Sequence, residues 1–359
     1  MDPTLLFRVL VVAKGFEPAF FTKVDPQKGI LDARLKARAA RTMPASQIVT
    51  GRVLAPDRKP VANAVVSVEE TVTGNTTHGS PLEGADPLAI TDESGQFEIR
   101  SPQKFDAVNV KVEARGFARR RFNGVTPGLS PTELVVTPGA ALAGRVMSGS
   151  KPVGNIAIGA AQTDRRAGGP FVGSFVTGTG EDGSFCFPNL PPDNEYAVYG
   201  LMDSLTGRGA LPTRLFRVKG DGSSNDMGTL QFTTGWRLAG QVTLSDSKPI
   251  PAHTRLVVGR DTAWDSGSAE LPPDGRFSLT DVPGEMLDLS VRINGYRLSD
   301  KNASLDHYNP FRLIGQLASD TTNLVILLEP GDDLPFGRNR SGPDPRNLPL
   351  GGIESKPAK

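Results

Sequence analysis

Histidine is the side chain best suited to acid–base and metal chemistry near neutral pH, and this chain has only three. They are His78, His253 and His307, and no two of them stand at the spacing of metal ligands. A zinc protease of the His-x-x-Glu type needs an acid three residues after a histidine, which none of them has. We therefore predict loop positions for all three histidines, and neither a metal site nor a cofactor.

The single cysteine, Cys186, is the candidate for a thiol nucleophile. It lies between Phe185 and Phe187 in a stretch with strand character, so its side chain should point away from theirs. No histidine stands near it in the sequence to activate it. The pattern predicts an inert thiol, buried or half-buried, and one cysteine excludes a disulfide framework.

Carboxylates could bind calcium, and an acidic turn before a glycine recurs at Asp92, Asp182 and Asp274. None belongs to a run such as Asp-x-Asp-x-Asp-Gly, which would gather several oxygens round one cation. Turn formation explains them, because aspartate and glycine favour tight hairpins. Since no nucleophile, base or metal set can be assembled, the sequence predicts no catalytic residue and a protein that is not an enzyme.

Sugar binding is the remaining specific chemistry, because flat aromatic rings can stack on pyranose rings. Aromatic residues make up 6% of the chain and 17 of them are phenylalanines, which we place mostly in cores. Trp236 follows a glycine at a domain junction and is expected to pack there. Trp264 lies in a polar loop after a strand and is the better candidate for a ligand-binding residue. The alternative role for Trp264 is an anchor of its loop or a lid on the core.

The charges are balanced: 40 Lys and Arg against 39 Asp and Glu give a net charge of +1, so no global field favours nucleic acid. A local cluster of Arg115 and Arg119 to Arg121 alternates with phenylalanines and indicates a solvated strand edge rather than an anion site. No apolar stretch approaches the roughly 18 residues that span a bilayer. The chain as given has no signal peptide, because Asp2 and Arg8 interrupt the expected basic and apolar regions.

A strand pattern recurs three times along the chain, and it shows which elements hold these side chains. Each copy opens with a glycine, any residue and a valine, preceded at period-2 spacing by an aliphatic residue. The three openings are Gly51-Arg52-Val53, Gly144-Arg145-Val146 and Gly240-Gln241-Val242. A Lys-Pro turn and a second aliphatic strand follow. Next comes the acidic turn with its glycine, which leads into Phe97, Phe185 or Phe277 and returns the chain to the core.

About seven short strands in roughly 90 residues, separated by turn signals, are typical of an antiparallel β-sandwich. No capped amphipathic helix is present to make the crossovers of a parallel sheet. We predict an all-β protein of tandem antiparallel sandwiches, with Greek-key, transthyretin-like or immunoglobulin-like connections. The three complete repeats are expected at 46–138, 139–234 and 235–331.

The two ends of the chain differ from these repeats. Residues 1–45 match only the second half of the template: Phe7 to Val11, then Gly15-Phe16, parallel Val108 to Val112, then Gly116-Phe117. Leu31, Ala33 and Leu35 then alternate like a closing strand, and the alternative is a short helix at 31–41. Half a sandwich leaves an apolar face and an edge open, so we expect either the C-terminal part of a longer polypeptide or a misplaced start codon. Residues 332–359 have no period and are predicted to form a disordered tail.

These motifs resemble those of the carboxypeptidase regulatory-like domain, a transthyretin-like or prealbumin-like sandwich with a carbohydrate-binding-like fold. The resemblance rests on Gly-x-Val, Lys-Pro-Val, Asp-x-x-Gly-x-Phe and Ala-x-Gly-Phe, and it covers about four-fifths of the chain. The second repeat departs from it, with Tyr199-Gly200-Leu201 in place of Gly-Phe. In that family the domains occur in tandem as accessory modules of secreted and cell-envelope bacterial proteins, and they carry no catalytic group.

The resemblance implies an extracytoplasmic protein, secreted, periplasmic or at the cell surface. The leading hypothesis is a non-catalytic structural or adhesive stalk whose partner is another surface protein. The alternative is an array of carbohydrate-binding modules that recognises a polysaccharide through Trp264. Fold analogy alone cannot choose between these functions.

Overall fold

The structure is a computed structural model that describes residues 6–13, 15–39, 43–163, 172–220, 222–260, 262–302, 305–309 and 311–331 of the chain. Most of these residues lie in strands, with one turn of α-helix, α1 (Met202–Leu205), and two turns of 3-10 helix, at Pro26–Lys28 and Ala45–Gln47. The predicted all-β class of tandem sandwiches is confirmed. The predicted disorder of 332–359 concerns residues outside this description. No helix in the described part of the chain is long and apolar enough to cross a membrane.

The described residues divide into two compact units. The first contains the chain as far as Ala140, together with Pro188–Pro192 and Gly220–Ser223. The second contains most of residues 141–219 and everything described from Ser224 onward. The second unit therefore holds nearly all of two sandwiches, and these two sandwiches contact each other.

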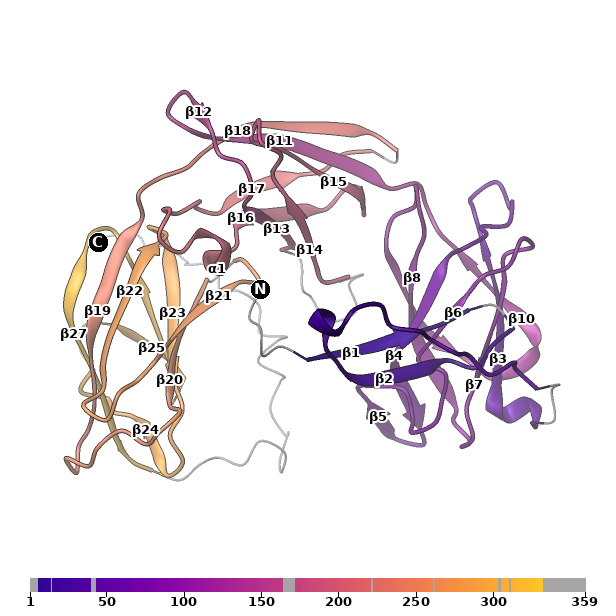
Figure 1. The fold of residues 1–359 in the computed structure, drawn as a ribbon, viewed down its shortest axis with the longest axis horizontal. Coiled ribbons are helices and arrows are strands. Elements are labelled where there is room, and N and C mark those ends of the chain that lie inside the picture. The colour runs from indigo at the N-terminus through magenta and orange to yellow at the C-terminus, as the bar shows by residue number, and fades with distance from the viewer. Residues whose placement is uncertain are drawn as a thin grey trace, which may run out of the picture. The chain divides into compact units, whose positions relative to one another are not determined.

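The N-terminal segment forms a hairpin of β1 (Phe7–Val11) and β2 (Ala19–Val24), shown in indigo in Figure 1. Residues 30–36 form neither helix nor strand, and Ala37 makes a single antiparallel bridge with Phe16. The alternative helix at 31–41 is wrong for the described residues 31–39. The expected closing strand is reduced to that one bridge.

The first sandwich packs two sheets within residues 48–135. One sheet has the order β10-β3-β7 and the other β5-β4-β8-β9, with β6 also pairing with β4. The strands are β3 (Ile48–Leu54), β4 (Val65–Thr73), β5 (Thr76–His78), β6 (Leu88–Ile90), β7 (Gln96–Arg100), β8 (Ala107–Glu113), β9 (Arg120–Val125) and β10 (Gly128–Val135). Alternate residues of β8, namely Val108, Val110 and Val112, point into the core that the two sheets enclose.

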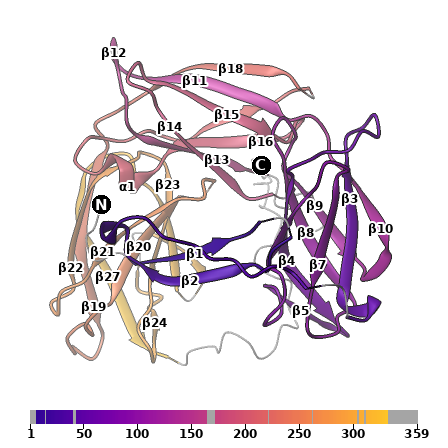
Figure 2. The ribbon, with the colours of Figure 1, turned by 45° about the vertical axis from the view of Figure 1, so that its right-hand side comes forward.

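The second sandwich occupies residues 140–231. Figure 2 shows β11, β15 and β18 in one layer and β13 and β16 in the other. The strands are β11 (Ala140–Ser148), β12 (Lys151–Pro152), β13 (Ala157–Gln162), β14 (Ser174–Gly178), β15 (Ser184–Leu190), β16 (Glu195–Gly200), β17 (Arg214–Arg217) and β18 (Ser224–Gln231). Helix α1 is inserted between β16 and β17. This insertion explains why the repeat lacks Gly-Phe after β16: its counterpart is displaced to Gly209-Ala210, where Ala210 bridges Thr233.

The third sandwich occupies residues 236–330, with one sheet in the order β22-β19-β27-β24 and the other β21-β20-β23-β26-β25. The strands are β19 (Trp236–Leu244), β20 (Arg255–Arg260), β21 (Ser266–Glu270), β22 (Arg276–Val282), β23 (Met286–Val291), β24 (Tyr296–Leu298), β25 (Asp306–Asn309), β26 (Arg312–Gln316) and β27 (Thr321–Pro330). Its core is mainly leucine, valine and isoleucine from both sheets.

Each sandwich also contains one parallel pair, which the prediction of antiparallel sheets did not include. The closing strand lies parallel to the opening strand: β10 beside β3, β18 beside β11, and β27 beside β19. Parallel neighbours need a long crossover, and we expected that to require a helix. Here the strands of the opposite sheet make the crossover instead.

The recurring glycine and phenylalanine are partners across neighbouring strands. Gly51 faces Phe97, and Gly240 faces Phe277. A Cβ added at Gly51 would lie 2.3 Å from the Phe97 ring, and one at Gly144 would lie 2.7 Å from the Phe185 ring. In the first two sandwiches the glycine is therefore required because the phenylalanine ring covers its inner face, whereas a Cβ at Gly240 would meet the backbone of Leu324.

Candidate functional site

The structure places the three histidines on three different elements. His253 lies in a turn, is exposed and contacts Glu270 at 3.4 Å. His78 ends strand β5 rather than lying in a loop, and its ring bonds with the Thr73 hydroxyl at 2.9 Å. His307 is in β25, also a strand, so the loop prediction is wrong for it too. Among the described residues, no three His, Cys, Asp or Glu side chains gather as a metal site would require.

Cys186 points away from the core residues Phe185 and Phe187, as the alternation predicts. Its thiol is exposed, however, so the prediction of a buried or half-buried side chain is wrong. The cause is the location of β15 in its sheet: the face opposite the core is open to solvent at this position.

The turn aspartates bind the backbone of their own turns. Asp92 Oδ1 accepts hydrogen bonds from the backbone N–H groups of Ser94 and Gln96 and from the Ser94 hydroxyl, at 2.7–2.9 Å. Asp182 makes the same contacts with Ser184, and the hydroxyl bond lowers the pKa of that carboxyl below its usual value. These bonds are those of Asx turns, which agrees with a role in hairpin formation.

The arginine cluster lies at and just before β9, the edge strand of its sheet, where it was expected. Two of its cations pair with carboxylates, Arg119 with Glu113 at 2.7 Å and Arg121 with Glu70 at 2.5 Å, and Arg120 donates to the backbone oxygen of Val135. These contacts agree with a polar outer face of the sheet.

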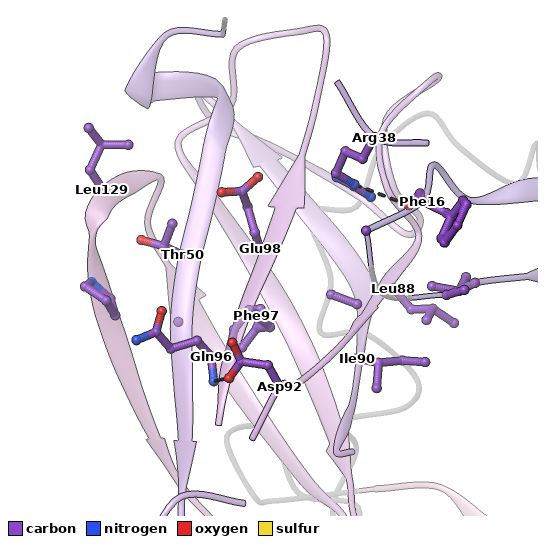
Figure 3. A pocket seen from close by; sticks show the side chains of 16 residues that line it. Phe16, Arg38, Thr50, Leu88, Ile90, Asp92, Gln96, Phe97, Glu98 and Leu129 are labelled. Carbon is purple, nitrogen blue, oxygen red and sulfur yellow. Dashed lines mark hydrogen bonds between the residues drawn. The ribbon is translucent and has the colours of Figure 1, made fainter. Parts of the chain in front are cut away.

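A pocket of about 390 Å³ lies in the first unit beside β3 and β7 (Figure 3). Thr50 and Glu98 lie on one side of it, with Phe16 and Arg38 of the N-terminal segment on the other. Two of the charged side chains that line it form ion pairs within the protein: Arg38 pairs with Asp86 at 2.8 Å, and Glu98 pairs with Arg100. We therefore assign no ligand to it.

A polar site in the second unit is centred on a buried arginine between the second and third sandwiches. Arg260 ends β20 on the face of the core residues Leu256 and Val258, and its side chain is 1% exposed. Its guanidinium donates to the backbone oxygen of Gly200 at 2.8 Å and to that of Leu211 at 3.0 Å, both in the second sandwich. A cation of the third sandwich is therefore held by carbonyl groups of the second.

Two carboxylates of the third sandwich balance this cation and also reach across. Glu285 accepts from Arg260 Nε and, through its other oxygen, from the backbone N–H of Thr213 at 3.1 Å. Asp265 Oδ2 lies 3.5 Å from Arg260 Nη1 and accepts from the backbone N–H of Met202 at 3.0 Å. Burial raises the pKa of Asp265 above its ordinary value, although the Met202 N–H and the arginine oppose that shift. Each carboxylate thus contacts Arg260 of the third sandwich and accepts a hydrogen bond from one backbone amide of the second.

Packing accompanies these polar contacts. The Tyr199 ring covers Gly159, the arginine lies 5.3 Å from the ring centre, and the Tyr199 hydroxyl donates to the backbone oxygen of Trp264 at 3.2 Å. Ala263 packs into the same buried cluster, with Ala161 and Ala197 of the second sandwich. Helix α1 lies beside β21 and β22 in both Figure 1 and Figure 2.

The structure places Trp264 in the loop that docks on the second sandwich. Its neighbours Ala263 and Asp265 are buried there, whereas its own side chain is 55% exposed. Its role as a ligand-binding residue stays a prediction. Trp236, expected to pack at the junction, is partly exposed at 38% and has its indole nitrogen beside Gly284.

Two features of the sequence point to this junction. Arg260 follows Leu256 and Val258 at period 2, which places a charge in an inward-facing position. Tyr196 to Tyr199 is apolar on both faces, as in a strand that is covered on both sides. Neither signal identifies the partner, because the carbonyl groups of Gly200 and Leu211 belong to the backbone.

No family model and no curated protein matches the chain. Solved structures similar to it include the Bacillus anthracis TIE protein, at 12% identity and a TM-score of 0.23 over 79% of this chain and 50% of that one. A streptococcal ancillary pilin matches at 10% identity and 0.27, over 79% and 99%. The Bacillus cereus major pilin subunit matches at 11% and 0.21, over 79% and 99%. The chain thus spans half the length of the first, and the function proposed below rests on its own residues.

Proposed function

We propose that this chain is a non-catalytic structural element, a stalk of tandem sandwiches that works outside the bacterial cytoplasm. The observation that carries the proposal is the buried Arg260 between the second and third sandwiches. The motif resemblance to tandem accessory domains supports the location, and another surface protein is the expected partner.

A stalk must transmit position or force, so its joints should hold one geometry. Interfaces between domains of one chain are commonly mobile unless they are large and apolar. Opening this junction would strip Arg260 of two carbonyl acceptors and would leave the amides of Met202 and Thr213 without their carboxylates. Because these partners fit only one arrangement, we infer that the second and third sandwiches move as one body.

The rigidity can be measured by placing one spin label on each sandwich. Cys186 is exposed on β15 and accepts the first label, and Asn323→Cys on the exposed face of β27 accepts the second. Electron–electron distance measurements should give a narrow distribution that broadens in Arg260→Met. Arg276→Met is the matched control, because that side chain is 78% exposed and outside the junction. A broad distribution in the unaltered chain would contradict the proposal.

The exposed ring of Trp264 favours a second candidate function, recognition of a polysaccharide. Because the loop is anchored through Ala263, Asp265 and the Trp264 carbonyl, Trp264→Ala should leave the junction intact. A polysaccharide array tests this candidate: saturable binding that Trp264→Ala abolishes would support it. Absence of binding by the folded chain would leave only the structural function.

A further inference from the structure

Two arginines join the N-terminal segment to the first sandwich, one from each side. Arg38 of the segment donates from both of its Nη atoms to the Asp86 carboxylate, at 2.8 Å and 3.2 Å. In return Arg100, the last residue of β7, donates from Nη1 to the backbone oxygen of Ala39 at 3.1 Å. The segment and the sandwich belong to one compact unit, and these contacts bind the one to the other.

The Asp86 carboxylate is held in place by the sandwich itself. Its Oδ2 atom accepts a hydrogen bond from the Arg100 backbone N–H at 2.9 Å, and the Asp86 N–H donates to the Arg100 backbone oxygen at 2.8 Å. The Asp86 side chain is 10% exposed and the Arg38 side chain 19%. A sheltered carboxylate that is already oriented fits the planar fork of a guanidinium through two bonds at once.

Arg38 is bonded just as closely to the hairpin of β1 and β2. Its backbone N–H donates to the oxygen of Gly15 at 2.8 Å, and its Nε donates to the oxygen of Phe16 at 3.3 Å, as Figure 3 shows. Both oxygens belong to the turn that joins the two strands. One side chain therefore connects the turn of the hairpin to the carboxylate of the sandwich.

The hairpin stands outside the core of the first sandwich. That core is built from residues between Val49 and Val136. Residues 30–36, which follow the hairpin, form neither helix nor strand. The pocket of Figure 3 has Phe16 and Arg38 on one side and sandwich residues on the other. The contacts of Arg38 and Arg100 therefore hold the two sides of this pocket together.

We propose that Arg38 is a latch that holds the N-terminal hairpin on the first sandwich, so that the two parts move as one body. When the latch is broken, the hairpin swings on residues 30–36 and the pocket opens. The device is like that of Arg260, because in both a guanidinium binds a carboxylate and backbone oxygen on the two sides of a boundary. Arg38 lies at a different boundary, so the latch and the proposed stalk function can fail separately.

Two spin labels measure the latch in the full chain. With Cys186→Ser as background, Thr22→Cys on β2 and Ser130→Cys on β10 place the labels on exposed residues of the two parts. Electron–electron distance measurements should give a narrow distribution. Arg38→Met should broaden it, with a rise of about 10-fold in the fraction of released hairpins, because the lost hydrogen bonds are charge-assisted.

The matched control is Arg34→Met, four residues away in the same segment. That side chain is 90% exposed and pairs with Asp32 of its own segment, so this variant should keep the narrow distribution. Asp86→Asn breaks the pair from the other side and keeps an oxygen for the Arg100 N–H. It should release the hairpin as Arg38→Met does, and the double variant should release it no further, because both changes remove the same interaction.

The variants should remain folded, because the core of the sandwich lies within residues 49–136, and thermal unfolding checks this. A broad distribution in the unaltered chain would overturn the inference. A narrow distribution that persists in folded Arg38→Met and Asp86→Asn would overturn it as well. Equal broadening by Arg34→Met would also refute it, since the effect would then come from the charge of the segment.

Discussion

Replacing Arg260 by methionine tests how the buried cation holds two sandwiches together. Methionine keeps most of the volume and removes the charge and all the donors. Glu285 and Asp265 would then share a buried site without a cation, and the oxygens of Gly200 and Leu211 would lose their donors. Breaking a buried ion pair from one side costs about 3–5 kcal/mol.

The free-energy cost measured for Arg260→Met should lie at the lower end of that range, because the junction can open and let water reach the carboxylates. Glu285 already has 17% of its side chain exposed, which eases its hydration. A cost of about 3 kcal/mol corresponds to more than a 100-fold rise in the fraction of open junctions. Each sandwich keeps its own core, so the variant should remain folded.

Amide hydrogen exchange reports this opening directly, at the backbone N–H groups of Met202 and Thr213. Both donate to the carboxylates that Arg260 holds, so their exchange should accelerate about 100-fold in Arg260→Met. Exchange in the core strand β23 should change little, and Arg276→Met should change none of these amides. Unchanged protection of Met202 and Thr213 in folded Arg260→Met would refute the reasoning.

Three further substitutions follow from single contacts. Gly51→Ala should destabilise the first sandwich by about 1–3 kcal/mol in denaturant unfolding, because its Cβ would meet the Phe97 ring, while Gly128→Ala, with no atom within 4 Å of its Cβ, should change it little. Thr213→Val should be neutral or stabilising by about 1 kcal/mol in thermal unfolding, since its buried hydroxyl has no hydrogen-bond partner; a loss would reveal one. The raised pKa of Asp265 means that the folded state binds its proton more readily, so this group contributes less stability as pH rises from about 4 through that pKa. Asp265→Asn should remove this pH dependence of stability. In melting curves from pH 4 to 7, the unfolding temperature of the variant should rise relative to that of the unaltered chain.

The local pattern of the sequence was enough for the class of fold. Period-2 alternation identified the inward side chains, such as Val110 and Phe185, because a strand exposes its two faces in turn. Asp92 and Asp182 were recognisable as turn residues, because an Asx turn is made within a few residues of chain. The half-template at the N-terminus was visible for the same reason.

Only the tertiary structure decided how these pieces meet. The parallel pairing of β3 with β10 joins residues about 80 apart, and no local pattern encodes it. The exposure of Cys186 depends on what covers the outer face of its sheet, which is not a property of its neighbours in the chain. The role of Arg260 depends on backbone carbonyl groups about 50 and 60 residues away, which every sequence possesses. Local sequence patterns predict the contacts made within a turn or a strand. Contacts between sheets and between sandwiches join residues far apart in the chain, so no local pattern predicts them.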